Sequence, residues 1–150
     1  MNQALACAKQ AYEQGEVPVG AVITAGGRII CGAFNQRETK KNALLHAESA
    51  AIYKACEIMG GWRLHMCDLY VTMEPCAMCA GAIINARINR VIFGVPDEKS
   101  GAFGSVIDLN QYAFNHKPQI TKGVCEVECR ALLQQFFKEL RARKRSERCD

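Results

Sequence analysis

The sequence has no run of apolar residues long enough to cross a membrane. A membrane helix needs ~20 consecutive apolar residues, and no segment of the 150-residue chain approaches that length. Residues 1–16 also lack the basic segment followed by an apolar run that marks a secretory signal. We therefore expect a cytoplasmic protein that does not associate with a membrane.

The chain likewise has no internal repeat, no low-complexity segment and no linker that would divide it. Its length suits one compact domain and leaves little room for a second. Apolar residues make up 49% of the chain, which is enough to build a core and argues against wholesale disorder. We expect a single domain over residues 1–150.

A disulfide framework is also not expected, although the chain has 9 cysteines. The number is odd, no export signal is present and the core needs no covalent cross-links, so reduced thiols are the better interpretation. Most of those outside the motif discussed below lie among apolar neighbours and are expected to be small core residues. These are Cys7, Cys31, Cys56 and Cys67.

The net charge of +4 is unevenly distributed. Residues 138–150 carry a net charge of +3, which leaves only +1 for residues 1–137. A basic tail on a nearly neutral body indicates a polyanionic partner. Basic residues also stabilise the C-terminus of any helix, so the charges alone leave both explanations open.

Hydrophobic periodicity predicts helices that alternate with strands. The expected helices are 2–14, 46–59, 75–86 and 124–145, and the expected strands are 19–24, 29–34, 69–73, 91–95 and 119–121. This order predicts an α/β protein, a three-layer α/β/α sandwich around a mixed sheet of about five strands.

Two short segments carry the residues most suited to chemistry, namely His46-Ala47-Glu48 and Pro75-Cys76-Ala77-Met78-Cys79. Cysteines three residues apart at the start of a helix share one face. The helix N-terminus also lowers thiol pKa values, which favours the thiolates that zinc binds. A Cys-x-x-Cys pair is equally typical of redox dithiols and of structural zinc sites.

A structural zinc site would require a second pair of ligands, and the chain offers no clean one. Cys125 and Cys129 lie four residues apart in a predicted helix and lack the turn of a zinc knuckle. His46, Cys76 and Cys79 would supply three ligands, and three protein ligands leave a tetrahedral zinc with one position for water. Zinc lowers the pKa of such a water to ~7.

Glu48 follows the histidine by two residues, and positions two apart on an ideal helix point about 200° apart. Both side chains can therefore face the metal only if the motif lies at the helix entrance. A glutamate there can move protons without binding the metal. A glutamate in a first helical turn also stabilises the helix dipole, but beside a histidine and a Pro-Cys-x-x-Cys segment we favour the proton-transfer role.

His-x-Glu followed by Pro-Cys-x-x-Cys is the known signature of the zinc-dependent nucleobase deaminases. Over nearly its whole length the chain resembles the bacterial tRNA-specific adenosine deaminases. The segments that carry the resemblance are GEVPVGAV at 15–22, FNQRE at 34–38, HAE at 46–48, LYVTMEPCAMCAGAII at 69–84, GAFGSVIDL at 101–109 and ECRALLQQFF at 128–137.

The resemblance implies a cytidine deaminase-like fold, one zinc ion per subunit and a homodimer. It implies that the enzyme converts the wobble adenosine of an arginine tRNA to inosine and releases ammonia. Asn35 matches the asparagine that binds the flipped base and its sugar. The loop 97–105 and the terminal helix would contact an anticodon stem-loop, with Asp97, Lys99, Ser100, Phe103 and Arg141 as candidate RNA contacts. The chain departs from the family pattern at residues 42–45 and at Phe103.

Two other functions fit parts of this pattern. A deaminase of a free nucleobase or nucleoside, such as guanine or cytosine, would use the same chemistry but has no use for a basic C-terminal extension. A zinc-stabilised RNA-binding protein without catalysis would leave Glu48 unexplained. We therefore expect a tRNA adenosine deaminase.

Overall fold

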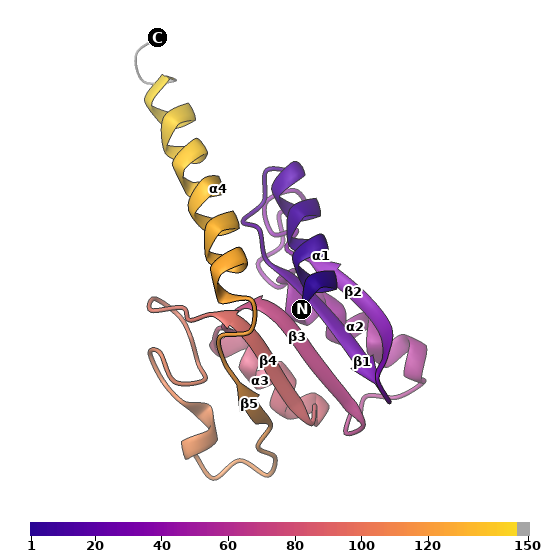
Figure 1. The fold of residues 1–150 in the computed structure, drawn as a ribbon. Helices are drawn as coiled ribbons and strands as arrows, with labels where there is room; N and C mark the ends of the chain where they lie inside the picture. Colours follow the sequence, from indigo (N-terminus) through magenta and orange to yellow (C-terminus); the bar gives the residue numbers. More distant parts are fainter. Residues whose placement is uncertain (147–150) are drawn as a thin grey trace.

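A computed structural model describes residues 1–146 and shows a five-stranded sheet between two layers of helices (Figure 1). The strands are β1 (Gly20–Ala25), β2 (Arg28–Phe34), β3 (Cys67–Met73), β4 (Arg90–Val95) and β5 (Gln119–Thr121). The helices are α1 (Asn2–Glu13), α2 (Ala47–Met59), α3 (Ala77–Ala86) and α4 (Glu126–Ser146), with a short 3-10 helix, η1, at Leu109–Gln111.

The sheet is mixed, with the order β2-β1-β3-β4-β5. β1 pairs antiparallel with both β2 and β3, whereas β3, β4 and β5 run parallel. Gly26 and Gly27 close the β1–β2 hairpin with positive φ angles of 55° and 76°, the backbone that a two-residue hairpin turn requires. Parallel strands need a crossover, and α3 supplies the one between β3 and β4.

Each face of the sheet is covered by two helices. α1 and α4 lie on one face, and α2 and α3 pack together on the other, where Figure 1 draws them behind the strands. The main core lies beneath α2 and α3 and includes Ala51, Ile83, Leu69 and Val91, all fully buried. β4 is buried along almost its whole length, as a parallel strand covered on both faces should be.

The three-layer sandwich and its five-stranded mixed sheet confirm the fold class predicted from the sequence. Two local predictions need correction. α3 begins at Ala77 and not at Pro75, because Cys76 keeps an extended backbone and is the N-cap. η1 was not predicted, because three residues are too few for a detectable periodicity.

The cysteines of the described chain are free thiols, as expected. Burial raises the pKa of Cys7, Cys31, Cys56 and Cys67, which keeps these thiols neutral. Cys7 and Cys67 are buried core residues, whereas Cys31 and Cys56 are only partly buried. Within residues 1–146, no helix is both long and apolar enough to span a membrane.

Candidate active site and metal centre

His46 lies at the entrance to α2, where the backbone is still extended and not helical (φ −72°, ψ 158°). Glu48 follows in the first helical turn, and its side chain is buried. The two residues would point apart on an ideal helix. Because His46 is the N-cap and its backbone is extended, the two side chains need not point apart as they would within a helix.

Cys76 occupies the corresponding position at the entrance to α3, also with an extended backbone (φ −72°, ψ 173°). Cys79 lies almost one turn further along and is fully buried. The segment follows directly from β3, so the end of a buried strand fixes where α3 begins. The two sulfurs therefore lie on the same side of the helix entrance.

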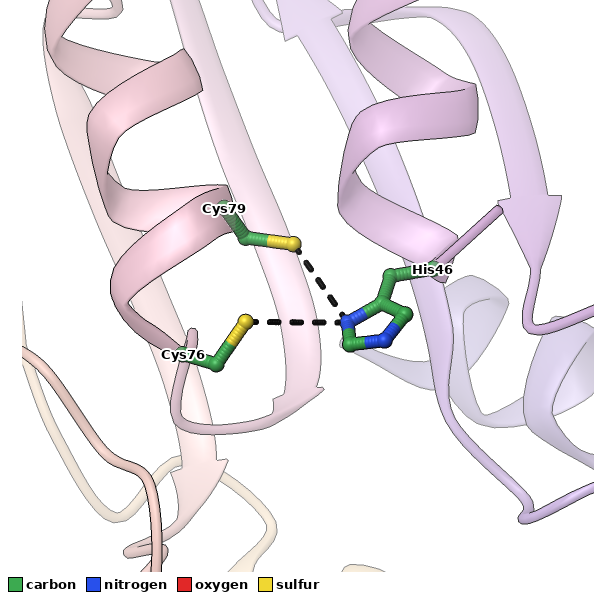
Figure 2. Close-up of side chains that lie close together, drawn as sticks. All are labelled: His46, Cys76 and Cys79. Atoms are coloured by element: carbon green, nitrogen blue, oxygen red, sulfur yellow. Dashed lines mark hydrogen bonds between the residues drawn. The ribbon is translucent and has the colours of Figure 1, made fainter. Parts of the chain in front are cut away.

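The entrances to α2 and α3 bring three potential metal ligands together (Figure 2). The sulfurs of Cys76 and Cys79 each lie 3.6 Å from Nδ1 of His46. Zinc–sulfur bonds of ~2.3 Å and zinc–nitrogen bonds of ~2.0–2.1 Å at a tetrahedral angle would separate nitrogen and sulfur by roughly 3.5 Å. The three donors thus fit one tetrahedral zinc ion in both chemistry and spacing.

The contacts among these side chains shift their pKa values. Hydrogen bonds with Cys79 and His46 lower the pKa of Cys76 to about 4, which makes Cys76 the more acidic thiol of the pair. The hydrogen bond with Cys76 raises the pKa of His46. A coordinated cation deprotonates the thiols that bind it, so metal binding would convert both cysteines to thiolates.

Glu48 borders the same site without joining the group of potential ligands. Only 4% of this residue is exposed, and its burial raises the pKa of the carboxyl to about 7. A carboxyl with such a pKa can accept and release a proton near neutral pH. Glu48 therefore offers a group that can exchange protons near neutral pH beside the three potential metal ligands.

His46, Glu48 and Cys76 form part of the wall of a cavity of about 160 Å³. That volume is below the ~300–1,000 Å³ of pockets for drug-sized ligands, so the cavity suits a single base more than a longer molecule. Asn35 lies in the wall and is buried, and its Oδ1 has no hydrogen-bond partner. An unpaired buried acceptor is costly, so this oxygen is available to a ligand.

Two further buried carboxylates belong to the surroundings of the cavity, and the sequence analysis did not single them out. Glu16 accepts hydrogen bonds from Asn35 Nδ2 and Thr39 N. Glu74 lies in the cavity wall and accepts hydrogen bonds from backbone N–H groups of the loop 97–105. The one local signal that could have identified them is a glutamate within a largely apolar segment, GEVPVGAV for Glu16 and LYVTMEPC for Glu74.

The five candidate RNA contacts lie in different surroundings in the structure. Asp97 and Ser100 line the cavity, and Lys99 is exposed between them. Arg141 is exposed on the part of α4 that projects beyond the sheet (Figure 1). Phe103 requires a correction, because it is only 1% exposed and packs in the main core. A side chain with so little exposed surface is not available to RNA in this arrangement.

Comparisons with known proteins identify the family. A family model described as MafB19-like deaminase matches residues 1–141. The tRNA-specific adenosine deaminase of Bacillus subtilis (strain 168) is 46% identical over 99% of this chain and 92% of its own length. The chain belongs to the tRNA-specific adenosine deaminase family.

Solved structures support the same assignment. One, from a study of A-to-I editing by tRNA:A34 deaminases at the wobble position of transfer RNA, matches with a TM-score of 0.86 and 42% identity. It covers 89% of this chain and 97% of the other. A guanine deaminase from Bacillus subtilis matches less well, with a TM-score of 0.60 and 30% identity over 76% of this chain and 83% of its own. The similarity is therefore greater to the tRNA deaminases.

We predict that the purified protein contains about one zinc ion per chain. His46→Ala and Cys76→Ala should each lose it, because removal of one donor leaves too few ligands. Cys129→Ala is the matched control, since Cys129 is buried in a separate apolar cluster between β4 and α4. Metal analysis of the four proteins by mass spectrometry tests this. Full zinc occupancy in both ligand variants would refute the assignment.

Proposed function

We propose that this chain deaminates the wobble adenosine of a tRNA anticodon loop to inosine, with an arginine tRNA as the substrate. One observation carries the proposal: His46, Cys76 and Cys79 converge beside a base-sized cavity, whose wall includes His46, Cys76 and buried Glu48. The names of the relatives support the substrate class. The arginine tRNA is what the resemblance of the sequence implies, and a tRNA substrate is consistent with a cytoplasmic enzyme.

We infer that the metal held by the three ligands is zinc, one ion per subunit. Thiolate and imidazole donors suit zinc, and three protein ligands are typical of a catalytic site. When bound, zinc would act as a Lewis acid and lower the pKa of a water molecule to ~7, which supplies the nucleophile for hydrolysis.

Glu48 is the residue that moves protons in this proposal. Its carboxylate accepts one proton from the attacking water and delivers it to the ring nitrogen next to the amine-bearing carbon. It then accepts the second proton, from the hydroxyl group that the water has become, and delivers it to the amine, which leaves as ammonia while that oxygen becomes the carbonyl of inosine. Because Glu48 is buried beside the ligands, its proton is not readily lost to bulk water. Ammonia leaves and an oxygen takes its place, so no redox cofactor is required.

The cavity accommodates a base but not the chain that carries it, so the target nucleotide must leave its stack. Extrusion costs a few kcal/mol and is least costly in a single-stranded loop. Asn35 faces the entering nucleotide with a free acceptor. Asp97 and Ser100 form another part of the wall, which supports a role for them in contacting the same nucleotide.

The exposed end of α4 offers a second surface for RNA. Arg141, Arg143, Lys144 and Arg145 are exposed on its last turns, which project away from the sheet (Figure 1). No ion pair links them to another residue within 1–146. Unpaired cations on a projecting helix suit a phosphate backbone. Arg148, the last basic residue of the tail, lies outside the described residues.

We infer that two copies of the chain associate through the outer side of α2 and α3. This side and the loop after α2 carry large exposed apolar residues, here called the apolar face: Tyr53, Ile58, Met59, Trp62, Met66 and Met78. Large apolar side chains exposed together on one side of a protein are typical of an interface between proteins. A homodimer would cover it.

The function is tested by incubating the protein with an arginine-tRNA anticodon stem-loop and analysing the nucleosides for inosine. We expect stoichiometric conversion of the wobble adenosine only. Glu48→Ala should retain zinc and bind the stem-loop, yet react at least ~10²-fold more slowly, the usual effect of a positioned acid–base group.

Three results would contradict this proposal. No inosine from the wild-type protein, together with rapid deamination of free guanine or cytidine, would favour the small-molecule alternative. Equal conversion of stem-loops from other tRNAs would remove the preference for arginine tRNA. Near-normal turnover of Glu48→Ala would assign proton transfer to another residue.

The tail is tested by truncation from Arg141 onward, which spares the buried side chains of α4. Each lost phosphate contact should reduce the slope of log affinity against log salt by roughly 0.7–0.9, with zinc content unchanged. The control is Arg130→Gln, which removes a charge already paired with Glu126. Binding of the stem-loop measured at several salt concentrations gives the slopes, and identical slopes for full-length and truncated proteins would exclude these contacts.

The dimer is tested by light scattering after size-exclusion chromatography. The wild-type protein should have twice the mass of one chain, and the double variant Tyr53→Glu/Met78→Glu should be monomeric because charge is costly in an apolar interface. Val127→Glu places the same charge on an exposed apolar site of α4, on the opposite face of the sheet, and should remain dimeric. A monomeric wild-type protein would refute the interface.

A further inference from the structure

Glu16 is a fully buried carboxylate that has no role in the chemistry proposed above. It lies in the connection between α1 and β1, directly after Gly15. Burial of a carboxylate is costly unless hydrogen bonds compensate it. The partners of Glu16 therefore indicate why it is buried.

Both oxygens of Glu16 accept hydrogen bonds near the cavity. Oε1 accepts one from the backbone N–H of Thr39 at 2.6 Å, and Oε2 accepts one from Nδ2 of Asn35 at 3.3 Å. The same Nδ2 also donates to the carbonyl oxygen of Val17 at 3.3 Å. An amide nitrogen has two hydrogens, so Glu16 and Val17 together occupy both.

This arrangement fixes which end of the Asn35 amide faces the cavity. Rotation of the amide by 180° would place Oδ1 against the carboxylate of Glu16 and the carbonyl of Val17, two contacts between acceptors. In the observed orientation Oδ1 is buried in the wall and has no partner among the described residues. Because Asn35 lines the cavity and its Nδ2 is already engaged, the unpartnered Oδ1 is the atom of this amide that remains for a ligand, and it can only accept a hydrogen bond.

We propose that Glu16 is a positioning residue that locks the Asn35 amide with its carbonyl toward the substrate, so that the site selects a nucleotide carrying a hydroxyl or N–H donor there. The identity of the substrate as a nucleotide rests on the proposed function. A ligand without that donor would leave Oδ1 unpaired in a buried wall and bind more weakly. Glu16 thus acts on specificity through Asn35 and does not touch the substrate.

Glu16→Gln tests whether Glu16 orients the Asn35 amide, because glutamine has almost the same shape as glutamate. If the glutamine oxygen keeps the hydrogen bond from Thr39, its NH2 group faces the NH2 group of Asn35, and two donors oppose each other. We expect kcat/KM on the stem-loop to fall roughly tenfold or more, as for a lost hydrogen bond to a charged group. Glu13→Gln removes an exposed carboxylate from the end of α1 and should leave kcat/KM unchanged.

A double-mutant cycle with Asn35→Ala separates positioning from a general effect on the fold. With no amide to orient, Glu16→Gln should lower kcat/KM by less than about threefold. An equally large loss in both backgrounds would overturn the proposal and leave Glu16 as a structural partner of Thr39. A thermal unfolding curve for each variant verifies that the compared proteins are folded.

A second measurement does not depend on activity. In the nitrogen–proton NMR spectrum of the wild-type protein, the side-chain NH2 of Asn35 should exchange slowly with water, since both hydrogens are bonded. Glu16→Gln should shift these signals and speed their exchange, whereas Glu13→Gln should not. Unchanged Asn35 signals in Glu16→Gln would overturn the proposal even if the chain deaminates tRNA. Failure of the wild-type protein to form inosine would instead count against the proposed function alone.

Discussion

The meeting of two helix entrances is the constraint on which the rest of the site depends. α2 and α3 pack side by side on one face of the sheet, and each begins with an extended residue that carries a metal donor, His46 in one and Cys76 in the other. The donors lie 30 residues apart in sequence, yet Sγ and Nδ1 are separated by 3.6 Å. Because rigid secondary structure sets this distance, the trio is preorganised for a tetrahedral ion and need not be assembled by it.

The same position explains the chemistry available to neighbouring groups. A helix N-terminus favours negative charge, so the thiolate of Cys76 is stabilised at the entrance to α3 in addition to its hydrogen bonds with Cys79 and His46. Glu48, in the first turn of α2, is held at the wall of the cavity by the helix that positions His46. Two buried glutamates then fix other parts of the wall. Glu16 orients Asn35, and Glu74 accepts hydrogen bonds from the loop that contains Asp97 and Ser100.

Much of this arrangement could be predicted from local sequence. The strands and helices follow hydrophobic periodicity. The Cys-x-x-Cys spacing at a helix start indicates a catalytic metal site only together with the histidine of the His-x-Glu segment and the lack of a clean second ligand pair. The His-x-Glu spacing required an entrance position, and the extended backbone of His46 confirms it. Pro75 misled the placement of the α3 boundary, because proline fixes φ but not ψ, and the helix starts two residues later.

The remaining features depend on contacts between distant segments. The hydrogen bonds of Glu16 and Glu74 join residues 19 to 31 positions apart, and no periodicity marks such pairs. The burial of Phe103 has the same origin, since a loop residue reaches the main core only after α3 and the sheet have packed. The assignment of a single domain to residues 1–150 and the role of each RNA contact remain predictions.

X-ray absorption at the zinc edge of the purified protein tests the central claim most directly, because it counts the atoms around the metal. The account predicts two sulfur neighbours at ~2.3 Å and two lighter neighbours at ~2.0–2.1 Å, one from His46 and one from solvent. Such a shell leaves a position at which hydrolysis can begin. A shell of three or four sulfurs would contradict the account, because such a shell is typical of a structural zinc site and would leave no catalytic role for Glu48.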